Sequence, residues 1–80
     1  MSTNRYERTT LGVNIRRLRG ERGWTQDQLG KYAETTSVGM IESGARADPA
    51  ASTVIAIAGA LGVTVADLYA APRKRTRKSA

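Results

Sequence analysis

The sequence predicts an all-α fold built from five short helices, and three observations lead to that prediction. Apolar residues recur at intervals of three and four along most of the chain, which is the period of an α-helix. Threonine or aspartate precedes several of these runs, and glycine or proline follows them, as at the ends of helices. No segment alternates apolar and polar residues as a strand does. Eighty residues make one domain at most.

The first predicted helix covers residues 11–22, with Thr10 as its N-cap. Spacings of four and three place its apolar residues on one face: Leu11, Ile15 and Leu18. Its arginines fall mostly on the other face: Arg16, Arg17 and Arg19. The helix ends at Gly23, which has the usual C-terminal glycine position. Trp24 then folds back onto the core at the corner, which is a structural role rather than stacking on a base.

Residues 24–44 predict two short helices separated by a very brief break. Thr25 caps the first helix, and Gln28 lies at capping-box spacing from it. The apolar face of that helix follows: Leu29, Tyr32 and Ala33. Poor helix formers then interrupt the pattern: Glu34, Thr35 and Thr36. Val38 and Ile41 start the second apolar face, and Gly44 is its C-cap. This helix-turn-helix either lays its second helix in the major groove of DNA or is an ordinary helical hairpin in a small bundle.

The fourth predicted helix starts with Asp48 as its cap and Pro49 in its first position, and runs to about residue 60. Its buried stripe has helical spacing, with Ile55 at the margin: Val54, Ile57, Ala58 and Leu61. Thr64 to Asp67 repeats the capping-box spacing and opens a short fifth helix, which ends before Pro72. That helix holds two large apolar residues: Leu68 and Tyr69.

Charge is distributed unevenly along the chain, whose net charge is +6. Arginine and lysine gather at both ends, and the middle is mildly acidic. We therefore expect a flexible arm over residues 1–9, a helix-turn-helix domain over residues 10–71 and a disordered basic tail over residues 72–80. Basic ends favour a polyanion partner, with nucleic acid ahead of a membrane surface. The simpler alternative is a soluble surface with a disordered tail.

Several classes of function are excluded by composition. The chain has no cysteine and no histidine, so it can form neither a disulfide framework nor a zinc or histidine-based catalytic site. Nothing groups the remaining carboxylates, lysines and hydroxyls, so we expect no enzyme, no cofactor and no small-molecule ligand. The longest apolar stretch, residues 54–65, is too short to span a bilayer, and residues 1–10 hold no signal segment. The absence of cysteine agrees with a cytoplasmic protein.

A series of segments along the chain matches the pattern of one family. They are Leu11-Gly12, Ile15-Arg16, Leu18-Arg19, Glu21-Arg22-Gly23-Trp24-Thr25-Gln26, Leu29, Ile41-Glu42-Ser43-Gly44, Pro49, Ala60-Leu61-Gly62-Val63 and Leu68. In this order, over about residues 10–70, they resemble the phage repressor/Cro-like helix-turn-helix family, also called the xenobiotic-response-element family. The resemblance implies a compact five-helix repressor-like DNA-binding domain, with the helix-turn-helix at helices 2 and 3. It implies double-stranded DNA as the partner.

The resemblance also implies which residues contact DNA. In the family, the residue equivalent to Gln26 binds a backbone phosphate, and the first part of the third helix reads base edges. Base contacts are then expected from the turn and the third helix: Thr35, Thr36, Ser37 and Met40. Phosphate contacts are expected from six polar or basic residues: Gln26, Arg16, Arg46, Arg73, Lys74 and Arg75. Thr36 as a simple N-cap, Gln26 as a first-turn residue and the arginines as a solvated face are the structural alternatives.

One departure from the family lies between the second and third helices. From Leu29 to Ile41 the chain is two residues shorter than the usual spacing, so the turn or the start of the third helix is shortened. Counting back from Ile41 buries Val38 and lets residues 35–37 lead the helix. Counting forward from Ala33 buries Met40 instead and lets Ser37 and Val38 lead the helix. Gly30 is expected to allow close approach of the crossing helices, and Gly39 indicates a weak third helix or a close approach to DNA.

Together these features predict a sequence-specific DNA-binding transcriptional regulator, with repression as the expected effect, that binds its operator as a homodimer. The fifth helix, with Val65 and Tyr69, is the expected dimer surface. A phage switch, a restriction–modification controller and the DNA-binding half of an antitoxin all fit this class. The alternative is a protein-interaction module, such as an antitoxin or an adaptor, on the same scaffold.

Overall fold

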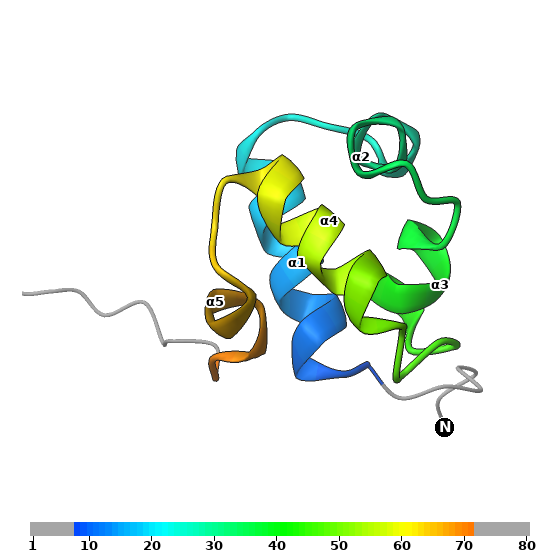
Figure 1. Ribbon diagram of the computed structural model, residues 1–80, viewed down its shortest axis with the longest axis vertical. Coiled ribbons are helices and arrows are strands. Elements are labelled where there is room, and N and C mark those ends of the chain that lie inside the picture. The colour runs from blue at the N-terminus through cyan, green and yellow to red at the C-terminus, as the bar shows by residue number, and fades with distance from the viewer. Residues whose placement is uncertain (1–7, 72–80) are drawn as a thin grey trace, which may run out of the picture.

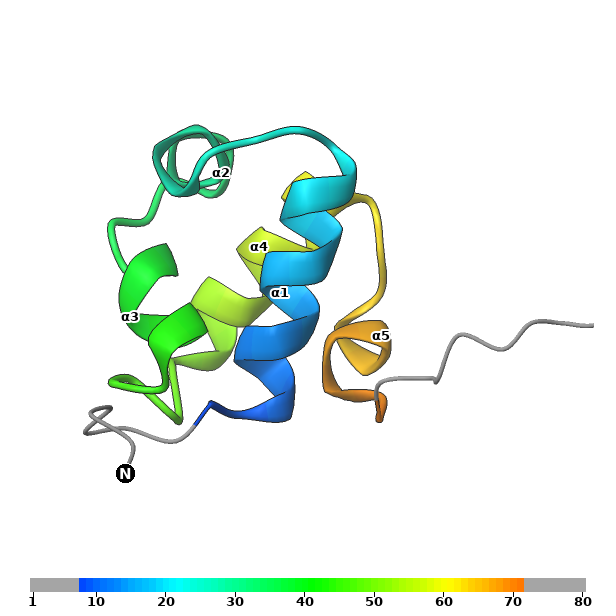
Figure 2. The ribbon, with the colours of Figure 1, turned by 180° about the vertical axis from the view of Figure 1, so that it is seen from behind.

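A computed structural model describes residues 8–71, and this part of the chain is all-α, as the sequence predicts. It holds five helices: α1 Thr10–Glu21, α2 Gln26–Ala33, α3 Val38–Ser43, α4 Ala51–Leu61 and α5 Val65–Tyr69. Helices α1 and α4 cross in the middle, with α2 and α3 on one side and α5 on the other (Figures 1 and 2). The expected arm and tail lie largely outside the described residues, at 1–7 and 72–80.

A single apolar core joins all five helices. Its largest side chains are almost completely buried: Ile15, Leu29, Ile41, Ile57, Leu61 and Leu68. The predicted stripe of α4 is buried as expected, and Ile55 at its margin is 60% exposed. No helix among residues 8–71 is both long enough and apolar enough to cross a bilayer.

Helices α2 and α5 begin with the two capping boxes that the sequence predicts. The Thr25 hydroxyl accepts from the Gln28 backbone N–H at 3.0 Å, and the Gln28 side chain accepts from the Thr25 N–H at 2.8 Å. Thr64 and Asp67 make the same reciprocal pair at 3.0 Å and 3.0 Å. Each box satisfies two backbone donors that a helix N-terminus otherwise leaves free, which defines where the helix starts.

Two other helix starts differ from the predictions. Helix α1 begins one residue earlier than predicted, because the hydroxyl of Thr9, not of Thr10, accepts from the Gly12 N–H at 2.9 Å. Helix α4 begins at Ala51 rather than Pro49. Its N-cap is Ala50, whose backbone is extended (φ −60°, ψ 147°), so Pro49 cannot be the first helical residue. Pro49 is instead a buried part of the loop.

The corner between α1 and α2 is closed by Gly23 and an aromatic pair. Gly23 has a left-handed backbone (φ +71°), and the Trp24 N–H returns to the Arg19 carbonyl at 3.1 Å, which ends α1 as predicted. Trp24 is half-buried against the core and stacks on Tyr32 at 4.6 Å between ring centroids. Tyr32 was expected on the apolar face of α2 but is 65% exposed, because this stack holds it outside the core.

Candidate nucleic-acid interface

The residues predicted to contact bases lie at the turn between α2 and α3 and on the outward side of α3. Thr36 and Met40 are exposed, and Thr35 and Ser37 are half-buried. An open groove between α2 and α3 brings Thr35, Thr36 and Met40 together with Gln26. The geometry therefore places three of the four predicted base-contacting residues in one groove with the first residue of α2, and Ser37 does not line it.

The structure decides between the two registers of the third helix. Val38 and Ile41 are 2% and 0% exposed, and Met40 is 44% exposed. Counting back from Ile41 thus identifies the buried residue correctly, and the forward count is wrong to bury Met40. The start of the helix, however, agrees with the forward count: α3 begins at Val38 with Ser37 as its N-cap, so residues 35–37 do not form its first turn. The Thr35 hydroxyl instead accepts from the Ser37 N–H at 3.1 Å and holds these residues as a turn.

The shortened connection folds tightly against α2. Glu34 has a left-handed backbone (φ 56°, ψ 47°), which ends α2 abruptly and turns the chain toward α3. The Thr35 N–H then returns to the Gly30 carbonyl at 2.9 Å. A Cβ on Gly30 would lie 2.6 Å from the Thr35 carbonyl oxygen. Gly30 therefore permits a close approach, but to the backbone of the turn rather than to a crossing helix as predicted.

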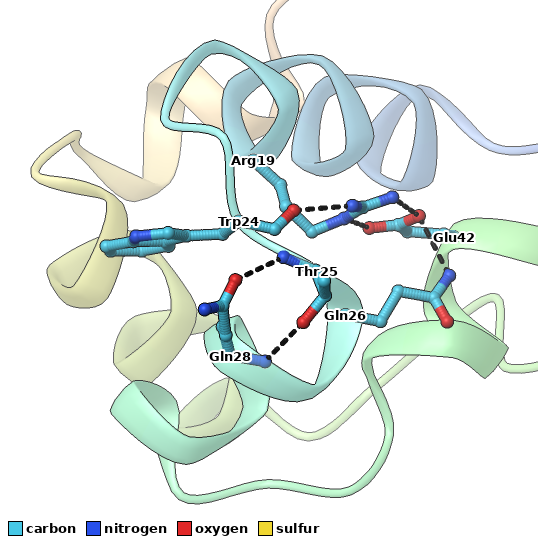
Figure 3. Close-up of polar contacts among 6 residues, drawn as sticks. All are labelled: Arg19, Trp24, Thr25, Gln26, Gln28 and Glu42. Carbon is cyan, nitrogen blue, oxygen red and sulfur yellow. Dashed lines mark hydrogen bonds and ion pairs between the residues drawn. The ribbon is translucent and has the colours of Figure 1, made fainter.

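A buried ion pair fixes α3 to α1. Glu42 is 6% exposed and accepts two hydrogen bonds from the Arg19 guanidinium, at 2.7 and 3.0 Å (Figure 3). Arg19 also donates to the Trp24 carbonyl at 2.8 Å, and the hydrogen bond to Glu42 raises the pKa of Arg19 above its ordinary value. Arg19 was expected among the solvated arginines of the first helix. That expectation is wrong, because its partner lies 23 residues away on another helix.

Gln26 belongs to the same network. Its side-chain amide donates to the Glu42 carboxylate at 3.1 Å, so the first turn of α2 is tied to α3 (Figure 3). Gly39 provides the room, since a Cβ there would lie 3.0 Å from the Gln26 amide oxygen. Gly39 thus makes room for a side chain of α2, a role that the sequence did not suggest, and its close approach to DNA remains a prediction.

The predicted basic contacts are spread around this groove rather than gathered in it. Arg16 is exposed on α1 and lines a second groove, together with Arg8 and Glu42. Arg46 is exposed in the loop after α3, where its backbone N–H donates to the Met40 carbonyl at 3.0 Å. Neither arginine lines the groove between α2 and α3. The remaining predicted phosphate contacts lie outside the described residues: Arg73, Lys74 and Arg75.

Sequence reasoning missed three charged residues that line the groove: Asp27 and Lys31 on α2, and Glu34 at its C-cap. Their spacing of four and three puts them on one face of the helix, which was the available signal. It also missed Asn14, which is buried and donates to the carbonyls of Leu68 and Ala70 at 2.8 Å each. Asn14 ties α1 to α5, the helix that lies on the opposite side of the molecule from α2 and α3 (Figure 2).

Comparison with known proteins gives a family match. The HTH_3 family, described as helix-turn-helix, matches residues 15–68, which is more than half of the chain. No curated protein is similar enough to count as a match.

Two solved structures are similar to the described fold. One is the restriction-modification controller protein C.AhdI from Aeromonas hydrophila, at 25% sequence identity and a TM-score of 0.71; the match covers 76% of this chain and 94% of that one. The other is the hypothetical transcription factor NHTF from Neisseria, at 30% identity and a TM-score of 0.75; here 90% of this chain and 84% of the other are covered.

Proposed function

The chain belongs to the HTH_3 helix-turn-helix family of non-enzymatic DNA-binding regulators, and from that premise we propose that it represses transcription by occupying a specific operator as a homodimer. The observation that carries this proposal is the exposed side of α3. Met40 is exposed there and Thr36 is exposed in the turn before it, while Glu42 on the opposite side fixes the helix to α1. A rigid helix with a free outer face is suited to enter the major groove.

The proposed contacts follow from the positions around that face. Base edges are met by the turn and the outward side of α3: Thr35, Thr36, Ser37 and Met40. Phosphates are met by Gln26 at the start of α2 and by Arg16 and Arg46 on the flanks. Beyond the described residues, Arg73, Lys74 and Arg75 add affinity without sequence preference, because Lys and Arg release counterions from any duplex.

Pairing of two chains is part of the proposal because one helix-turn-helix makes few base contacts. Helix α5 supplies a suitable surface, with Tyr69 51% exposed and Val65 36% exposed. Among the roles that fit the class, the likeness to C.AhdI favours a restriction–modification controller. Such a regulator acts where the cell's DNA lies, which agrees with a cytoplasmic location.

Titration of duplex DNA across a series of salt concentrations tests the proposal. The full chain should bind with an affinity that falls as salt rises, and deletion of residues 73–80 should reduce that slope by up to about one unit per lost phosphate contact. Ser37→Ala is the matched variant, because it should reduce discrimination between sequences and leave the slope nearly unchanged. Binding that does not depend on salt would overturn the proposal.

Sedimentation velocity tests the dimer. Tyr69→Ser should weaken self-association, because it removes the largest exposed apolar side chain of α5. Tyr32→Ser is the control, since Tyr32 is 65% exposed but lies on α2, on the other side of the molecule (Figure 1). A chain that sediments as a monomer both alone and on its operator would contradict the dimer.

One observation supports the second candidate, a protein-interaction module on the same scaffold. Asp27 and Glu34 bring two carboxylates, against one lysine, into the groove between α2 and α3. Carboxylates repel phosphates and suit a basic protein partner. The salt titration separates the candidates, because a protein-interaction module has no need to bind arbitrary duplex DNA.

A further inference from the structure

The outward side of α3 offers very few hydrogen-bonding groups to a base. The helix has six residues, and its outward positions are Met40 and, one turn later, Ser43. Thr36 lies in the turn before α3 and lines the same groove as Met40, and Ser37 is the N-cap of α3. None of residues 35–43 carries the planar amide or guanidinium group that reads adenine or guanine through two hydrogen bonds.

Most of the polar groups that are present already have partners within the protein. The Ser43 hydroxyl donates to the Met40 carbonyl at 3.1 Å and accepts from the Ala45 N–H at 3.2 Å. The Thr35 hydroxyl holds the turn through the Ser37 N–H, and the Gln26 amide donates to Glu42. The free hydroxyls of Thr and Ser pair with either donors or acceptors, so they discriminate weakly between bases.

The group that remains most available is apolar. Met40 is 44% exposed, whereas its neighbours Val38 and Ile41 are buried. Its unbranched thioether can adapt to an irregular surface, and the exposed Thr36, which lines the same groove, carries a further methyl group. In the major groove, the matching apolar feature of a base is the C5-methyl group of thymine.

We propose that this surface recognises thymine by its C5-methyl group, through Met40 and the methyl group of Thr36. The inference rests on the proposed function, because it requires the outward side of α3 to enter the major groove. It predicts that the operator has A·T base pairs at the positions under α3, each with the C5-methyl group of its thymine placed where Met40 or Thr36 can cover it. Asp27 and Glu34 do not compete for this role, since α2 crosses the backbone in this motif.

The experiment removes the methyl groups from the DNA and leaves the protein unchanged. Random-sequence duplexes are enriched by binding to the full chain, and the enriched pool is copied once with thymidine and once with deoxyuridine triphosphate. Both pools have the same base sequences, and only the second lacks the C5-methyl groups. We expect the deoxyuridine pool to bind about fourfold more weakly for each methyl group that Met40 or Thr36 covers.

A matched pair of variants connects the effect to the residue. Met40→Ala should bind the two pools with affinities closer together than the unchanged chain does, because the apolar partner is gone from the protein. Ile55→Ala, which removes an exposed apolar side chain of α4 outside the groove, should keep the full difference. Met40 and Ile55 are exposed, so both variants should melt at the temperature of the unchanged chain, and this is checked first.

Three outcomes are decisive. Equal binding of the two pools by the unchanged chain, with salt dependence retained, would overturn methyl recognition and leave the proposed function standing. A difference that persists in full in Met40→Ala would also overturn the inference. Failure to enrich any duplex would remove the proposed function and the inference together.

Discussion

On its inward side α3 carries Val38, Ile41 and Glu42, each at most 6% exposed, whereas Met40 on its outward side is 44% exposed. The inward residues pack into the core or pair with Arg19 on α1. The outward side is held by none of these contacts. A helix of six residues can therefore carry stability on one side and recognition on the other, and substitutions on the two sides should have separable effects.

The largest expected effect is that of removing the buried charge. Glu42→Ala should lower the free energy of unfolding by about 3–5 kcal/mol, because Arg19 would remain half-buried without its partner. Glu21→Ala is the control, since it removes the exposed ion pair with Arg17 and should cost no more than about 1 kcal/mol. Urea denaturation measures both. Equal losses would mean that burial of the Arg19–Glu42 pair does not matter.

Apolar truncation compares the two sides of α3 directly. Ile41→Ala should lose about 2–5 kcal/mol of stability, as should Leu29→Ala and Leu61→Ala elsewhere in the core. Met40→Ala, one residue away, should change stability by no more than about 0.5 kcal/mol. Thermal melts of the four variants would contradict the comparison if Met40→Ala proved as damaging as Ile41→Ala.

A pair of glycines in α1 tests how closely α3 is held on its inward side. A Cβ on Gly12 would lie 2.5 Å from the Ile41 carbonyl oxygen, so Gly12→Ala should cost about 1–3 kcal/mol by pushing the two helices apart. Around Gly20 the described residues leave open space, so Gly20→Ala should be neutral or stabilise by up to about 1 kcal/mol. Opposite signs in denaturation curves are the expected result.

The N-cap residues of α2 and α3 add a second comparison, because the exposure of a side chain does not by itself determine how much its substitution changes stability. Thr25→Ala should cost about 1 kcal/mol, since it breaks the capping box of α2. Ser37→Ala at the start of α3 should be nearly neutral, because within the described part of the chain the Ser37 hydroxyl makes no capping hydrogen bond. A marked loss of stability in Ser37→Ala would show that the start of α3 is held by this side chain after all.

The smallest expected effect concerns pH. The backbone N–H of Thr64 donates to the Asp67 carboxylate and lowers the pKa of Asp67 below its ordinary value. The carboxylate therefore stabilises α5 at neutral pH, and this contribution is lost as the pH falls through the lowered pKa. Melts from pH 6 downward should show the advantage of the unchanged chain over Asp67→Ala shrinking in acid. An advantage that stays constant would argue against this contribution.

The fold could be predicted largely because its signals are local. The capping boxes at Thr25 and Thr64 placed two helix starts correctly, since a cap and its partner are three residues apart. The predicted start of the fourth helix at Pro49 was wrong, because the sequence does not distinguish a proline that starts a helix from one that is buried in a loop. The same limit applies to Thr9 and Thr10, which are adjacent residues with identical side chains.

The site was less predictable because its structure depends on contacts across the fold. Arg19 had the helical spacing of a solvated residue, and only the position of Glu42 on α3 gives it a partner. The connection between the second and third helices is two residues shorter than is usual in the family, and the sequence did not show whether the turn or the third helix is shortened. Burial of Val38 or Met40 depended on that choice. In the structure, α2 ends at the left-handed backbone of Glu34. The DNA contacts of Thr35, Thr36, Ser37 and Met40 remain predictions.

The corner between α1 and α2 also provides an optical reporter. Trp24 is the single tryptophan of the chain, it stacks on Tyr32, and the Arg22 guanidinium lies 5.2 Å from its ring centroid. Two residues further on, Gln26 starts α2 beside the groove. Fluorescence from this one indole therefore reports on the environment of α2 without any label. A change in its emission when duplex DNA is added would follow binding in solution, in real time and at low protein concentration.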